Sequence, residues 1–158
     1  MLQLIIINQS FKTQSEEPYL YKLDKLFDYF SNLKKWKDLE GTINLILMDD
    51  EEIQELNKNY RNKDKPTDVL SFPYLAENEI KTNSDSGFVI GEIFISKSQA
   101  IADAKELKLT LEEELNKLLI HGVLHILGYD HIDDNDFLEM KKNEDLILKS
   151  FQGEIINE

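Results

Sequence analysis

The stretch H-G-V-L-H-I-L-G-Y-D-H at positions 121–131 contains all three histidines of this 158-residue chain. On a helix, residues i and i+4 lie on one face with their β-carbons roughly 5 to 6 Å apart, so His121 and His125 can direct ring nitrogens at one point. Gly128 falls where the helical pattern stops, and a glycine there can adopt the left-handed conformation that reverses the chain. This reversal can bring His131 back as a third ligand.

Three imidazoles with an open fourth position are typical of a catalytic zinc site. Closed structural sites usually contain thiolates, and this chain has no cysteine. The pattern therefore predicts one zinc ion per chain, bound by His121, His125 and His131. An ordinary, partly buried histidine is the commoner alternative for any one of them, but it explains three at this spacing poorly.

The histidine spacing equals that of the metzincin motif H-E-x-x-H-x-x-G-x-x-H, including its glycine. Gly122 stands where that motif has its general-base glutamate. A protease of this type would lack its proton acceptor, which argues against peptide hydrolysis by the usual route. Gly122 leaves room either for a bulky substrate or for close helix packing, and the sequence does not separate these alternatives.

Hydrophobic patterns around this stretch predict one α/β domain over residues 1–158, with a mixed, roughly four-stranded sheet flanked by helices. The histidine motif makes one of these helices a zincin-like metal-binding helix. Capping-box patterns begin helices at Ser96 and Thr110. Residues 62–66 must be irregular before Pro66, and 81–87 is expected to be a loop. The strands are expected at 2–8, 42–48, 68–73 and 88–95, and the helices at 19–33, 50–60, 96–107, 110–127 and 135–151.

Composition excludes several classes of protein. With 18 basic and 31 acidic residues, the net charge is 18 − 31 = −13, which argues against a general nucleic-acid coat. No apolar run approaches the roughly 18 residues of a membrane helix, and the first residues lack the features of a signal peptide. The absence of cysteine fits a cytoplasmic location. Residues 130–145 hold seven acids, a pattern typical of a solvated helix face.

The segment 56–73 contains the only arginine, Arg61. Between residues 57 and 65 there are four positive charges and one negative charge, so an anionic ligand is expected to dock here. Arginine offers a rigid, bidentate fork for phosphate that lysine lacks, which makes Arg61 the candidate phosphate contact. Lys63 and Lys65 are further candidates for substrate binding, although a solvated helix end is the simpler explanation for them.

These motifs resemble the YbeY family of bacterial ribosomal-RNA maturation factors, which are metal-dependent endoribonucleases. The resemblance rests on 121–131, on L-N-K-N-Y-R-N-K-D-K-P-T-D-V-L-S-F-P at 56–73 and on I-G-E-I-F-I-S at 90–96. It implies zinc on the three histidines, an RNA-processing role for Arg61, and maturation of the 3′ end of small-subunit ribosomal RNA. Its implied partners are ribosomal RNA and the small ribosomal subunit with its proteins.

Glu92 takes the place of the aspartate usual in the family, and it is a candidate for proton transfer or for a polar strand position. Two other functions stay open beside the nuclease. One is a zincin-like metalloprotease, and the other is a non-catalytic ribosome-assembly factor whose zinc only joins helix to loop.

Overall fold

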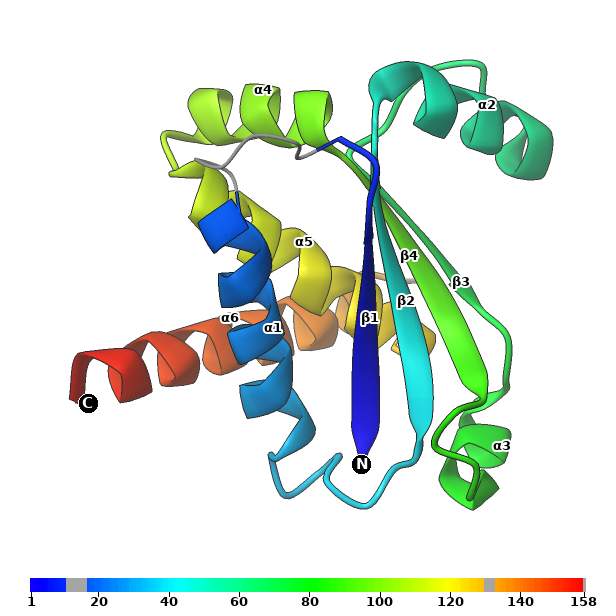
Figure 1. Cartoon of the computed structure of the whole chain (residues 1–158), viewed down its shortest axis with the longest axis vertical. Coiled ribbons are helices and arrows are strands. Elements are labelled where there is room, and N and C mark those ends of the chain that lie inside the picture. The colour runs from blue at the N-terminus through cyan, green and yellow to red at the C-terminus, as the bar shows by residue number, and fades with distance from the viewer. Residues whose placement is uncertain (11–16, 130–132, 158) are drawn as a thin grey trace.

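Four strands form a mixed sheet in the order β1-β2-β4-β3 (Figure 1). The strands are β1 (Leu2–Asn8), β2 (Gly41–Met48), β3 (Val69–Pro73) and β4 (Val89–Ser96). β1 pairs with β2 and β2 with β4 in parallel, whereas β3 runs antiparallel along β4 as an edge strand. This computed structural model describes residues 1–10, 17–129 and 133–157.

Helices cover both faces of the sheet within the described ranges (Figure 1). One face carries the main core, where α1 (Glu17–Ser31), α5 (Leu111–Ile126) and α6 (Asp134–Asn157) pack. The other face carries a smaller cluster in which Ile53 of α2 (Asp50–Arg61) packs on β2 and β3. The remaining helices are α3 (Glu77–Thr82) and α4 (Lys97–Leu107). None of the helices in the described part of the chain is both long and apolar enough to cross a membrane.

The predicted α/β class and mixed four-stranded sheet are confirmed, and so are the capping signals. The Thr110 hydroxyl accepts from the Glu113 N–H at 3.1 Å, and the Glu113 carboxylate accepts from the Thr110 N–H at 3.1 Å. At Ser96 one of the two bonds of the predicted box forms: its hydroxyl accepts from the Gln99 N–H at 3.3 Å, whereas the Gln99 side-chain amide donates to Asp50. These bonds begin α5 and α4 where the sequence indicates.

The prediction of a loop over 81–87 is wrong at its start, because Lys81 and Thr82 belong to α3. This helix depends on Ile80, which is 2% exposed within the main core. The Glu79 carboxylate accepts from the Ala76 N–H at 2.9 Å and closes the first turn. A short helix held by one buried side chain has too little periodicity to be visible in the sequence.

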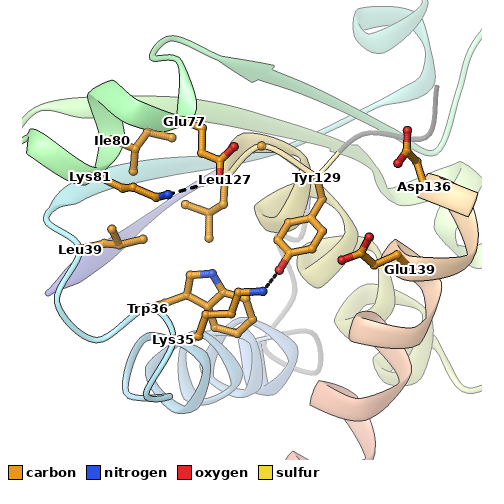
Figure 2. A pocket seen from close by; sticks show the side chains of 11 residues that line it. Lys35, Trp36, Leu39, Glu77, Ile80, Lys81, Leu127, Tyr129, Asp136 and Glu139 are labelled. Atoms are coloured by element: carbon orange, nitrogen blue, oxygen red, sulfur yellow. Dashed lines mark hydrogen bonds and ion pairs between the residues drawn. The ribbon is translucent and has the colours of Figure 1, made fainter. Parts of the chain in front are cut away.

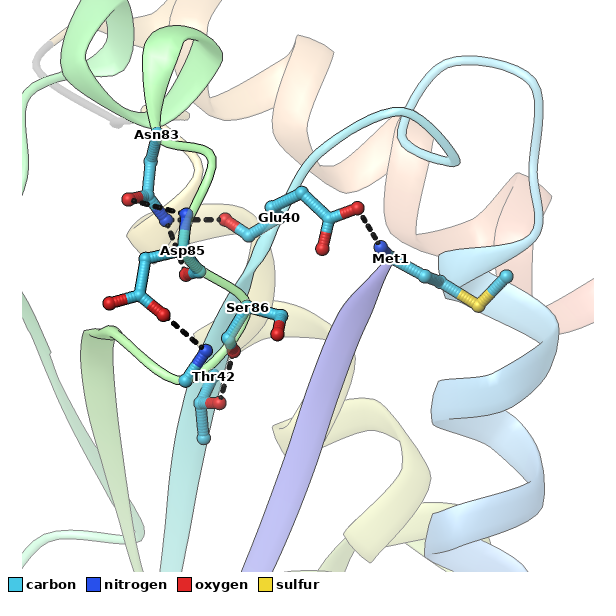
Figure 3. Close-up of polar contacts among 7 residues, drawn as sticks. Met1, Glu40, Thr42, Asn83, Asp85 and Ser86 are labelled. Carbon is cyan, nitrogen blue, oxygen red and sulfur yellow. Dashed lines mark hydrogen bonds and ion pairs between the residues drawn. The ribbon is translucent and has the colours of Figure 1, made fainter.

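The loop after α3 is fixed to the start of β2 (Figure 3). The Asn83 side-chain amide donates to the Glu40 carbonyl at 2.9 Å, and the Thr42 hydroxyl donates to the Ser86 carbonyl at 2.7 Å. The Asp85 carboxylate accepts from the Gly87 N–H at 3.0 Å. These bonds hold the entry to β4, the central strand on which α5 packs.

Candidate metal centre

Helix α5 lies unusually close to strand β4 because glycines occupy the contact on both sides. A β-carbon on Gly122 would come within 2.9 Å of Ile93, and one on Gly91 would come within 2.8 Å of Ile126. Gly122 is buried against the sheet. Of the two explanations that the sequence left open for this glycine, room for a bulky substrate or close helix packing, the structure therefore favours close packing. Position 122 leaves no room for the glutamate of a metzincin.

His121 and His125 lie together on the half-buried face of α5. Their ring centroids are 4.7 Å apart, and the rings are nearly perpendicular at 76°. The i, i+4 spacing thus brings the two imidazoles into contact, as predicted. His131, the third predicted ligand, lies outside the described residues, so the full ligand set stays a prediction.

Glu144 of α6 contacts His121 and was missed in the sequence. Its Oε1 lies 2.5 Å from the His121 Nδ1, and the residue is 7% exposed. A cavity of about 180 Å³ adjoins the pair and is lined by side chains of α5 and α6, among them Phe137 and Met140. The acids of 130–145 were expected to be solvated, and Glu144 departs from that pattern because it is buried between the two helices.

The donor atoms present fit a zinc ion. Neutral imidazoles are preferred zinc ligands, and two of them come here from one rigid helix. A metal-binding histidine commonly donates its other ring N–H to a carboxylate, which matches the Glu144 contact. The residues that would hold the ion are therefore His121 and His125, together with His131 beyond the described chain.

Helix α5 ends as the sequence indicates. Gly128 has a φ of +106°, and its N–H donates to the His125 carbonyl at 3.1 Å. The next residue, Tyr129, contacts the Lys35 ammonium through both its hydroxyl and its ring, and it lines a cavity of about 670 Å³ with Trp36 (Figure 2). Two lysines and three carboxylates line this cavity, so it does not select for an anion.

Arg61 is the last residue of α2 and is exposed, as are Lys63 and Lys65. Asn62 follows in the left-handed conformation with φ 58°. The buried Asn57 amide donates to the Lys65 carbonyl at 3.0 Å and folds this turn back onto the helix. The structure therefore presents the three predicted cationic residues on one short, held segment.

This basic segment and the histidines belong to elements on different faces of the sheet. Helix α2 packs on the face opposite α5 through Ile53. The chain after Arg61 runs into β3, the edge strand that also packs against α5. The edge formed by β3 is thus what separates the two predicted parts of the site.

Glu92 lies on the sheet face opposite α5, because its neighbours Gly91 and Ile93 both point at that helix. Its carboxylate accepts from the Asn44 side-chain amide at 3.4 Å and, by a short contact, from the Tyr74 hydroxyl. The structure does not bring it to the histidine pair. The position of Glu92 therefore does not favour proton transfer at the metal, which is one of the two roles expected for this residue.

Replacing Glu92 by glutamine tests this separation. Burial first, and then the hydrogen bond and charge of Glu92, raise the pKa of Tyr74 to about 12 from 10.0. We expect the variant Glu92→Gln to lower the pKa of Tyr74 toward 10. NMR of labelled tyrosines measures this change, and the variant Tyr74→Phe assigns the signal. The rate of RNA cleavage should stay within about threefold of wild type, well short of the 10²-fold or more that general acid–base catalysis contributes. A loss on that larger scale would show that Glu92 acts in the reaction.

Three carboxylates form a second group of possible metal ligands near the start of α5. Oxygens of Asp68, Asp103 and Glu114 all lie within 4.8 Å of one another. Burial, and then the charge and hydrogen bond of Asp68, raise the pKa of Asp103. Burial raises the pKa of Glu114, and the ammonium of Lys117, 3.6 Å from Glu114 Oε2, opposes that effect. Seven residues of helix, about 10 Å, separate Glu114 from His121, so this group is distinct from the histidine pair.

The fold is thus an α/β domain whose helix α5 carries a pair of candidate metal ligands, His121 and His125. A family model described as endoribonuclease YbeY matches residues 5–152. The endoribonuclease YbeY of Nautilia profundicola is 45% identical over 131 residues, which cover 83% of this chain and 84% of the relative. That of Caldicellulosiruptor saccharolyticus is 36% identical over 156 residues, which cover 94% of this chain and 96% of the relative.

A solved structure agrees with these sequence matches. The solution structure of a Thermotoga maritima protein superposes with a TM-score of 0.68 at 29% identity, covering 98% of this chain and 92% of that one. The chain belongs to the endoribonuclease YbeY family. Its reaction class is therefore that of an endoribonuclease, a hydrolase that acts on RNA.

Proposed function

We propose that residues 1–158 form one zinc-dependent endoribonuclease domain that acts on single-stranded RNA in maturing the 3′ end of small-subunit ribosomal RNA and in ribosome quality control. The contact between His121 and His125 on α5 carries this proposal, because it supplies paired metal ligands in a chain of an endoribonuclease family. We place the protein in the cytoplasm, where these ribosomal precursors occur.

The proposed site divides the work between two elements. His121, His125 and His131 would hold the ion, which when bound would supply Lewis acidity for cleaving a phosphodiester bond. Arg61 binds the RNA phosphate with its planar fork and offsets negative charge that develops there. Lys63 and Lys65 extend the cationic path for the RNA backbone. We assign Glu92 to the support of Asn44 and Tyr74 on the sheet face opposite α5.

The path of the RNA follows from where these residues lie. The exposed segment 61–65 leads directly into β3, and α5 packs against that same edge strand. A single strand that follows the lysines across this edge reaches the helix of the histidines. A duplex is wider and stiffer than a single strand, so we expect the substrate to be single-stranded.

The net charge of −13 supports a ribosomal setting for this reaction. Bulk electrostatics disfavour free RNA, and the cationic strip is short. Protein contacts on the small subunit would supply the affinity that the acidic surface does not. The protease alternative is disfavoured by the packing of Gly122 on Ile93, which excludes a glutamate at that position.

Variants of Arg61 test the RNA part of the proposal. With a small-subunit rRNA precursor carrying its 3′ extension, we expect Arg61→Ala to lower the cleavage rate by on the order of 10²-fold, the loss typical of one electrostatic stabiliser. Arg61→Lys should recover only part of this, because a point charge replaces a bidentate fork. Mapping the ends of the products identifies the site of cleavage.

Lys63→Ala is the matched control, since it removes one charge from the same exposed turn. We expect it to weaken RNA binding only severalfold and to reduce the salt dependence of binding by roughly one phosphate contact. Equal rates for wild type, Arg61→Ala and Arg61→Lys would remove Arg61 from the mechanism. Cleavage that also survives loss of the histidines would show that the activity does not come from the proposed site.

A further inference from the structure

The contact between Glu144 and His121 joins α6 to the helix that carries the metal ligands. The Glu144 carboxylate is buried, whereas the other acids of the first half of α6 include exposed residues such as Asp145. Its Oε1 lies 2.5 Å from Nδ1 of His121, within hydrogen-bond distance. Burial of a carboxylate costs free energy unless a partner compensates, so this side chain is held in place by the imidazole.

The groups around the pair do not explain the burial in another way. Lys117 and Lys141 line the same small cavity, but the ammonium of Lys117 is paired with Glu114 at 3.6 Å and Lys141 is exposed. Phe137 and Met140 provide the apolar part of the lining. Among the described contacts of Glu144, the one to Nδ1 of His121 has the geometry of a hydrogen bond.

A carboxylate at Nδ1 determines which nitrogen of the ring can bind a metal. The carboxylate oxygen can only accept, so Nδ1 must carry the proton, and Nε2 becomes the ligand atom. The hydrogen bond also fixes the plane of the ring. His125 has its own orientation on the next turn, nearly perpendicular to His121.

We propose that Glu144 is a positioning residue for the metal centre: it holds His121 in the Nδ1–H form with Nε2 directed to the ion, and thereby strengthens zinc binding. This inference rests on the proposed function, since it requires zinc on His121. It adds to the site a residue from α6, an element that supplies none of the proposed ligands. Loss of such a partner typically weakens metal affinity about 10–100-fold.

The test is the zinc affinity of Glu144→Gln, measured by competition with a chromogenic chelator. Asp145→Asn is the matched control, because it removes the same charge from the adjacent, exposed position. We expect the zinc Kd to rise about 10–100-fold for Glu144→Gln and to stay within about threefold of wild type for Asp145→Asn. Equal affinities in wild type and both variants would overturn the role of Glu144.

Two further measurements keep this test decisive. Nitrogen-15 NMR of the metal-free wild type should show the Nδ1–H tautomer at His121, and an Nε2–H tautomer would overturn the inference even if Glu144→Gln failed to fold. His121→Ala separates the two proposals. If it binds zinc as tightly as wild type, the metal site itself is wrong, whereas loss of zinc in His121→Ala with normal affinity in Glu144→Gln contradicts only the inference about Glu144.

Discussion

Replacing His125 by alanine should remove zinc from the protein and lower the rate of RNA cleavage by at least about 10²–10³-fold, while the domain stays folded. The loss should reach this scale because one of three ligands disappears. Folding should persist because His125 is only half-buried, whereas the core contacts of α5 come from Leu118, Leu119 and Val123.

Metal content, thermal unfolding and cleavage measured on one preparation check this expectation. Wild type treated with a chelator is the matched control: it should lose cleavage to a similar extent and regain it when zinc is added back, whereas His125→Ala should not. Unfolding of both the variant and the chelated wild type would support an assembly factor with a purely structural ion. A variant that keeps one zinc and full activity would refute the proposed site.

The second large effect is expected on stability, at Gly122. An alanine there would place its β-carbon 2.9 Å from Cγ2 and 3.0 Å from Cδ1 of Ile93, so the helix or the strand must move. Overpacking of this kind costs about 1–3 kcal/mol, which exceeds the gain of about 1 kcal/mol that alanine brings to a helix. We therefore expect Gly122→Ala to lower the free energy of unfolding in urea.

Gly153 in α6 provides the control, because a β-carbon there would meet nothing within 4 Å. Gly153→Ala should stabilise the protein by about 0.5–1 kcal/mol. In a double variant with Ile93→Ala, which removes the clashing atoms, the cost of Gly122→Ala should shrink by 1 kcal/mol or more. If Gly122→Ala were as stabilising as Gly153→Ala, α5 would not be held against β4 by this contact.

The elements with local signals could be predicted from the sequence. The caps of α4 and α5 depend on residues three positions apart, and the histidine pair depends on residues four apart. Strand alternation likewise reveals that β4 has two different faces. It does not reveal which face α5 covers, and so Glu92 could not be assigned to the opposite side in advance.

The features that were missed depend on contacts between distant segments. Ile80 holds α3 in place only because the core of the folded domain receives it. Glu144 looks like one more acid in a charged helix, and only the packing of α6 on α5 brings it to His121, 23 positions away. The group of Asp68, Asp103 and Glu114 draws on three separate elements or their flanks for the same reason.

The backbone contact at Gly122 also limits how this motif can evolve. The single substitution Gly122→Glu would complete the metzincin motif in the sequence. In this fold, that step would place a carboxylate against Ile93 between α5 and β4, and the domain would lose its stability before it gained a new general base. A glutamate at position 122 therefore requires a smaller residue than Ile93 on the strand side of the contact. The close packing of helix and sheet thus acts as an evolutionary barrier between two chemistries that share one histidine spacing.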